Sequence, residues 1–88
     1  MPEIARGQGI VIRIRAEPRA QHHLPHYHAF YSGHQASFGI DPFGLLTGNF
    51  PNRQQGILED WTAQHVDALL DNWNRAQSGQ ATYRIPGP

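Results

Sequence analysis

The stretch that decides the fold reads PHYHAFYSGHQASFGI and spans residues 25–40. Pro25 suits the start of a strand, and the apolar residues that follow it alternate with polar ones, as in a half-buried strand. Residues 32–35, with the sequence Ser-Gly-His-Gln, favour a turn. The stretch therefore predicts a β-hairpin with strands at 26–31 and 36–40, joined by a four-residue turn.

A register for this hairpin follows from its apolar positions. If Tyr31 faces Ala36, every second residue of both strands lies on one apolar face. His26 and His28 then project from the opposite face together, because side chains two apart in a strand share a side of the sheet. In this register His26 faces Asp41, which could orient the imidazole or bind a metal ion beside it. A plain turn residue is an equally good interpretation of Asp41.

The rest of the chain completes an α+β fold. Residues 10–15 alternate isoleucine with valine or arginine and predict a strand, and residues 45–49 predict a short further one. Apolar residues at steps of three and four predict helix over 52–77, about 39 Å long if continuous, so we expect a kink or break near Gln64–Val66. The predicted architecture is a small antiparallel sheet of three or four strands followed by one kinked or two consecutive C-terminal helices.

The length and composition limit the classes of protein. The 88 residues predict a single domain, 1–88, with flexible or loosely docked ends at 1–9 and 79–88. A chain this short buries only about 60–65% of its unfolded surface, which favours self-association or another small protein as partner. No apolar run is long enough to span a membrane and no signal-peptide core is present, so the sequence predicts a soluble cytoplasmic protein.

Charge and cysteine content narrow the chemistry further. Seven arginines balance seven acidic residues and lysine is absent, so charge does not indicate a nucleic-acid partner, although it does not exclude one. The chain has no cysteine, which leaves histidine and carboxylate as the ligands of any metal site.

Four of the six histidines lie within the seven residues 22–28. Neutral imidazole is a good ligand for zinc, nickel, copper or iron, so the cluster predicts a site for a divalent transition metal. Histidines that cap a loop and bond to backbone would produce the same pattern, and this interpretation stays open. The candidate metal ligands are His22, His26 and His28, with His23 or His65 as a fourth member and Asp41 as a carboxylate.

Five segments along nearly the whole chain carry a family resemblance: Met1–Ile4, Gly9–Arg13, Pro25–Ala29, Gly48–Pro51, and Trp61 through His65 to Asn72-Trp73. Through them the chain resembles the small bacterial family catalogued as domain of unknown function 4160. Pro-His-aromatic-His-Ala is the most specific block, and His22 fits the family's His-x-Pro-Pro-His pattern. The sequence departs from that pattern at Leu24, where a proline is typical, and at His23, where a small polar residue is common.

The resemblance implies a protein partner but no reaction. Members of this family are often encoded beside another small uncharacterised domain, in what resembles a toxin–antitoxin arrangement. Three function classes therefore stay open. They are a metal-binding accessory or regulatory protein that acts with a partner, a small nuclease or phosphoesterase toxin that uses the histidine cluster, and an interaction module with structural histidines. In the second class Arg13, Arg15 or Arg19 would bind the phosphate, and the absence of a Gly-x-Ser-x-Gly nucleophile frame counts against it.

Overall fold

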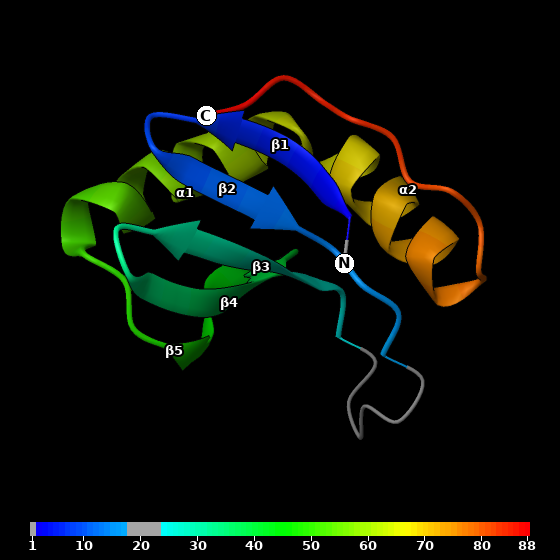
Figure 1. The fold of residues 1–88 in the computed structure, drawn as a ribbon, viewed down its shortest axis with the longest axis horizontal. Helices are drawn as coiled ribbons and strands as arrows, with labels where there is room; N and C mark the ends of the chain where they lie inside the picture. Colours follow the sequence, from blue (N-terminus) through cyan, green and yellow to red (C-terminus); the bar gives the residue numbers. More distant parts are fainter. Residues whose placement is uncertain (1, 18–23) are drawn as a thin grey trace.

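The structure is a computed structural model that describes residues 2–17 and 24–88. It has the predicted α+β architecture, an antiparallel sheet with two C-terminal helices packed against one face (Figure 1). The sheet has five strands rather than three or four, because residues near the N-terminus form an additional strand beside the first predicted one. The elements in chain order are β1 (Glu3–Gly7), β2 (Ile10–Arg13), β3 (His26–Tyr31), β4 (His34–Ile40), β5 (Phe43–Gly48), α1 (Asn52–Gln64) and α2 (Val66–Gln77).

The strands form a meander in which each strand pairs with the next, so that β1 and β5 are the two edges. The turn between β3 and β4 consists of Ser32 and Gly33 alone, with φ angles of 44° and 82°. Positive φ at both central residues matches the right-handed twist of the flanking strands, and glycine adopts it without steric cost. A two-residue turn of this kind fixes the register of the whole hairpin.

The predicted register of this hairpin is wrong by two residues. Tyr31 pairs with His34 rather than with Ala36, and His26 pairs with Gly39. The prediction failed because it assigned four residues to a turn that closes with two. Since side chains alternate with a period of two, the shift leaves each residue on its predicted face but removes Asp41 from the position opposite His26.

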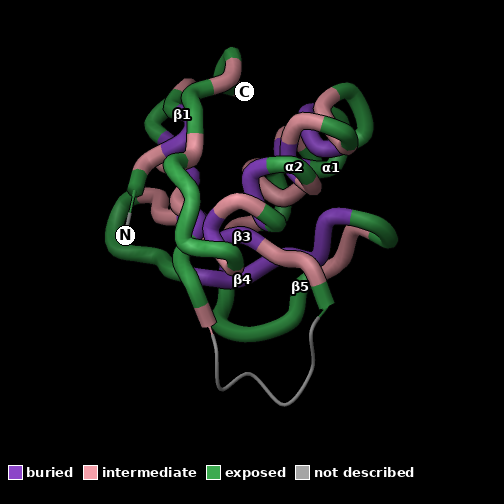
Figure 2. The backbone as a smooth tube through the Cα atoms, turned by 90° about the vertical axis from the view of Figure 1, so that its right-hand side faces the viewer, coloured by how far each residue is buried: buried purple, intermediate pink, exposed green. Residues whose placement is uncertain are grey.

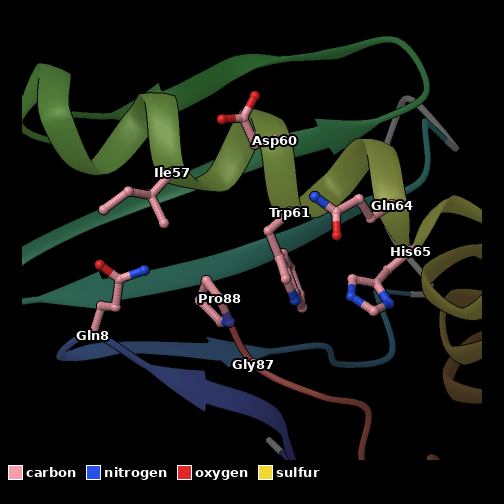
Figure 3. A pocket seen from close by; sticks show the side chains of 8 residues that line it. All are labelled: Gln8, Ile57, Asp60, Trp61, Gln64, His65, Gly87 and Pro88. Carbon is pink, nitrogen blue, oxygen red and sulfur yellow. The ribbon is translucent and has the colours of Figure 1, made fainter.

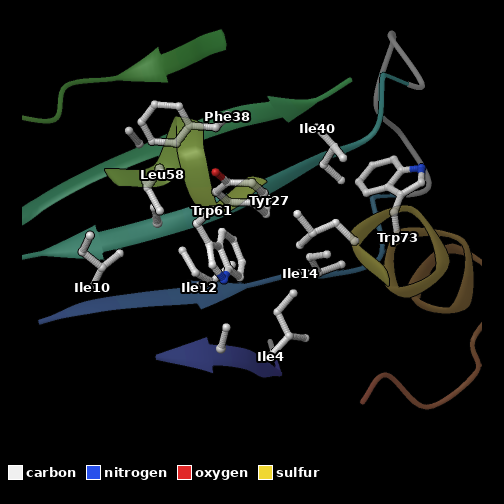
Figure 4. Packing of buried hydrophobic residues seen from close by; sticks show 14 of the residues in the cluster. Ile4, Ile10, Ile12, Ile14, Tyr27, Phe38, Ile40, Leu58, Trp61 and Trp73 are labelled. Carbon is white, nitrogen blue, oxygen red and sulfur yellow. The ribbon is translucent and has the colours of Figure 1, made fainter. Parts of the chain in front are cut away.

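The core lies between the sheet and the two helices (Figure 4). Buried strand positions alternate with partly exposed ones along β2 and β3, and Figure 2 shows the buried positions where the helices face the sheet. Tyr27 is fully buried, and its hydroxyl shares a 2.8 Å hydrogen bond with Thr62 of α1. The largest apolar residues of the core are Ile4, Ile10, Ile12, Ile14, Tyr27, Phe38, Ile40, Phe50, Leu58, Trp61, Leu69 and Trp73.

The helical region is broken where the sequence predicts it. Helix α1 ends at Gln64, α2 begins at Val66, and His65 between them has φ −131° and ψ 24°, outside the helical region. The break lets both helices stay on a sheet that is too small for one straight rod. Helix α2 therefore reaches the end of the sheet where β2 stops and β3 starts (Figure 1).

The C-terminal residues run beside β1 (Figure 1). The amide of Ile85 donates to the carbonyl of Ile4 at 2.8 Å, and the Trp61 indole donates to the carbonyl of Pro86 at 2.8 Å. Gly87 lies so close to the strand that an added Cβ would overlap the carbonyl oxygen of Arg6. This segment thus covers the β1 edge of the sheet.

Asn72 anchors the same segment from α2. Its fully buried amide donates to the carbonyl of Tyr83 at 3.0 Å and accepts from the Tyr83 amide at 2.9 Å. Asn72→Ala should therefore lower the free energy of unfolding by roughly 1–3 kcal/mol, the usual cost of leaving such groups unpaired. Urea denaturation would measure it, with Asn74→Ala, an exposed position of the same helix, as control. Equal effects of the two substitutions would contradict the anchoring role.

Glu3 links β1 to the C-terminal segment through ion pairs with Arg6 and Arg84, at 2.7 and 2.9 Å. The hydrogen bonds from Arg6 and then Arg84 lower the pKa of Glu3 from its ordinary 4.5 to about 2. A lowered folded-state pKa stabilises the fold above pH 4.5, and this contribution is lost as the pH falls toward 2. The difference in unfolding free energy between wild type and Glu3→Gln should therefore shrink between pH 5 and pH 2.5. An exposed acid on α1, changed as Glu59→Gln, is the control, and a Glu3 difference that stays constant with pH would contradict the linkage.

Candidate metal centre

Two imidazoles and one carboxylate meet at the start of β3. One nitrogen each of His26 and His28 and one oxygen of Glu17 all lie within 4.8 Å of one another. His26 Nε2 is 2.6 Å from Glu17 Oε2, and His28 Nε2 is 3.0 Å from Glu17 Oε1. The side chains are only 12%, 12% and 17% exposed, in the order His26, His28 and Glu17. Each carboxylate oxygen of Glu17 thus contacts one histidine, and the three side chains are largely shielded from solvent.

The strand pairing positions these three residues. His26 and His28 are alternate residues of β3 and share a side of the sheet, as predicted. Strand β2 runs antiparallel to β3 with Arg13 opposite His28, so the chain that leaves β2 passes the start of β3 and carries Glu17 to the imidazoles. The close approach of one carboxylate to both rings is a direct result of this pairing.

The last residue of α2 holds the Glu17 segment in place. The Gln77 amide oxygen accepts a hydrogen bond from the Glu17 amide, and the Gln77 amide nitrogen donates to the Arg15 carbonyl, both at 2.9 Å. Two bonds from one planar amide fix the backbone on either side of Ala16. The group therefore depends on the sheet for its histidines and on α2 for its carboxylate.

The orientation of the His26 ring is set by the backbone. Its Nδ1 lies 2.9 Å from the carbonyl oxygen of Leu24, and a carbonyl only accepts, so Nδ1 carries a hydrogen. The Trp73 ring packs against the imidazole with centroids 4.8 Å apart. Nε2 consequently points at Glu17 Oε2, which lies 2.6 Å away. A metal-binding histidine usually donates one ring N–H to a group such as a backbone carbonyl and binds the ion with its other nitrogen, and the Nδ1 bond of His26 fits this arrangement.

Burial and hydrogen bonding act against each other on His28 and on Glu17, and the pKa of each group is lowered. Burial lowers the pKa of His28 below its ordinary 6.5 despite the hydrogen bond to Glu17, which favours the neutral ring at pH 7. Burial works to raise the pKa of Glu17, but hydrogen bonds from Arg15 and His28 outweigh it and hold the pKa below its ordinary 4.5. Near neutral pH the group therefore offers a carboxylate and a neutral imidazole, the protonation states that bind metals.

The structure joins two of the predicted ligands to a third that the sequence analysis did not identify. His26 and His28 belong to the group and Glu17 is the addition, whereas His22 and His23 lie outside the described residues. Asp41 is exposed at the turn after β4 and is not among the three clustered residues.

His65 is also outside the group. It lies at the break between the helices, with its ring centroid 5.5 Å from that of Trp61. There it lines a cavity of about 270 Å³, together with Trp61, Asp60 and Gln64 (Figure 3).

Glu17, His26 and His28 could hold a metal ion. A tetrahedral site with bonds of about 2.1 Å places its donor atoms roughly 3.4 Å apart, so the contacts of 2.6 and 3.0 Å would open by a few tenths of an ångström or more. Two histidines with one carboxylate occur in catalytic zinc sites and in non-haem iron sites. Three protein ligands also leave at least one coordination position for another molecule.

The fold and the group of Glu17, His26 and His28 define a small α+β protein with a histidine–glutamate cluster at the end of its sheet. The family model described as Domain of unknown function (DUF4160) matches residues 9–74, which include all three clustered residues, and the chain belongs to this family. Comparison with curated proteins and with solved structures gives no match. In the part of the chain that the structure describes, neither helix has the length and apolar character needed to cross a membrane.

The hydrogen bonds predict which ring nitrogen carries the proton in metal-free protein at pH 7. The neutral His28 ring should be protonated at Nε2, because Nε2 faces a carboxylate that can only accept. His26 should carry a proton on Nδ1, which faces the Leu24 carbonyl. Long-range proton–nitrogen NMR correlations distinguish these forms. A His28 ring protonated at Nδ1 alone would contradict the geometry.

Proposed function

We propose that this protein is a metal-binding accessory or regulatory protein, in which Glu17, His26 and His28 hold a divalent transition metal ion. The observation that carries the proposal is the His26 ring, which is held at Nδ1 by the Leu24 carbonyl and presents Nε2 to a carboxylate that also receives His28. Zinc, iron, nickel and copper all accept this mixed nitrogen and oxygen ligand set.

The proposal includes a protein partner. Its support is the β5 edge, where Leu45 and Leu46 are 44% and 43% exposed. Neighbouring exposed leucines on an open sheet edge are typical of surfaces that pair with another chain, either a second copy or another small protein. An open position on the metal would let such a partner, or a ligand that it brings, influence the site.

Metal binding can be followed through the tryptophan beside the site. Trp73 packs against His26, so binding of nickel or copper should quench its fluorescence, and Trp73→Phe should lose most of this signal. The protein is purified without a histidine tag, analysed for bound metal and titrated with nickel or zinc. Its molar mass in solution, measured on the same sample, tests self-association through β5.

Substitution of the ligands is the decisive experiment. Replacing His26 and His28 together by alanine should lower metal affinity at least about tenfold, the scale of a lost ligand. Glu17→Gln should have a similar effect while it preserves the side-chain shape. His34→Ala is the matched control, because this imidazole lies on the same hairpin but bonds to Asn49 instead. If the His26 and His28 double variant and Glu17→Gln bind metal like wild type, or if wild type binds none, the cluster is structural and the proposal is wrong.

A further inference from the structure

We infer that the metal ion binds together with an oxyanion, a phosphate or carboxylate group, and that Arg15 holds this anion beside the metal. The inference rests on the proposed function and names the ligand class of the same site. It follows from where the structure places the Arg15 guanidinium and from the charge that a metal ion would add there.

Arg15 lies at the site itself. Its Nε donates to Glu17 Oε1 at 3.0 Å, and the same oxygen accepts from His28. A metal ion bound to Glu17 Oε1 at about 2.1 Å would therefore be no farther than about 5 Å from the Arg15 Nε. The Arg15 side chain is 53% exposed, so the outer part of the guanidinium can meet a ligand from solvent.

Among the residues that the structure describes, the charges of the metal-loaded site do not balance without an anion. In the metal-free site the Glu17 carboxylate is matched by Arg15 and by the imidazole hydrogens. A divalent ion adds two positive charges, while the two neutral imidazoles bring none, so metal, Glu17 and Arg15 together are positive. Because Glu17 supplies only one negative charge, Arg15 then opposes metal binding unless a second anion offsets the remaining positive charge.

The geometry of the donors favours an oxyanion over a simple halide. Among the contacts of the described residues, Arg15 uses Nε for Glu17, which leaves its terminal nitrogens as donors in a planar fork. Phosphate and carboxylate can place one oxygen on the open coordination position of the metal and another on this fork. Chloride offers a single atom, so it cannot use separate atoms for the metal and for the guanidinium fork.

The experiment measures nickel affinity by Trp73 fluorescence in methyl phosphate, in acetate and in chloride at equal ionic strength. Wild type should bind nickel roughly three- to tenfold more tightly with either oxyanion than with chloride. Arg15→Gln should lose this enhancement and should bind nickel more tightly than wild type in chloride, because the repelling charge is gone. The two oxyanions distinguish a phosphate ligand from a carboxylate ligand. Arg53→Gln, an exposed position on α1, controls for the change in net charge.

A second substitution at Arg15 separates the effect of its positive charge from the effect of its planar guanidinium donors. Arg15→Lys keeps the positive charge, so its nickel affinity in chloride should stay near that of wild type, while the oxyanion enhancement falls. Circular dichroism verifies the folding of each variant, and the wild-type comparison does not depend on any of them.

Failure of this inference differs from failure of the metal site. If wild type binds nickel equally well in all three anions, or if Arg15→Gln keeps the full enhancement, the inference is overturned and the metal site stands. If wild type does not bind nickel, zinc or another transition metal in any of the anions, both proposals fail together.

Discussion

The antiparallel pairing of β2 with β3 is the constraint on which the site depends. It sets Arg13 opposite His28 and thereby determines where the chain leaves one strand and enters the next. The chain segments on both sides of this point, together with α2, supply the described groups that surround the histidines. Glu17 arrives from the departing chain, the Leu24 carbonyl comes from the arriving chain, and α2 contributes Trp73 and Gln77 from the side.

The break at His65 allows α2 to bring Trp73 and Gln77 to the candidate metal group. A single straight helix would carry its second half past the small sheet, whereas the broken helix turns at His65 so that Trp73 packs on His26 and Gln77 bonds to the Glu17 segment. The same helix holds the C-terminal segment through Asn72. One twelve-residue helix therefore connects the candidate metal group, the core and the covering of the β1 edge.

Local patterns in the sequence predicted the parts of the structure that are set locally. Alternation identified the faces of β3, and therefore the shared side of His26 and His28, because a strand's period does not depend on what lies next to it. The break in the helical region was predicted from the length that a continuous helix over 52–77 would have. The hairpin register could not be predicted in this way. Ser32-Gly33 can form a two-residue turn or part of a four-residue turn, and the choice depends on φ angles that the sequence does not state.

Glu17 was missed for a different reason. It precedes Pro18 in a polar loop and shows no motif, and only the pairing of β2 with β3 brings it to the histidines. Because a long connection separates these strands, the turn rules that restrict a tight hairpin do not determine their register. The signal that could have found Glu17 is an assumed pairing of residues 10–15 with 26–31, extended beyond both strand ends.

The segment that runs beside β1 makes the two edges of the sheet unequal. With Gly87 seated against Arg6 and Ile85 bonded to Ile4, the β1 edge in the described part of the chain is occupied, and β5 is the edge left open. Another chain could then add a strand at the β5 edge but not at the β1 edge. Two copies that join at β5 would form a closed pair with no further strand to offer, so the arrangement blocks the open-ended growth that leads from exposed sheet edges to fibres.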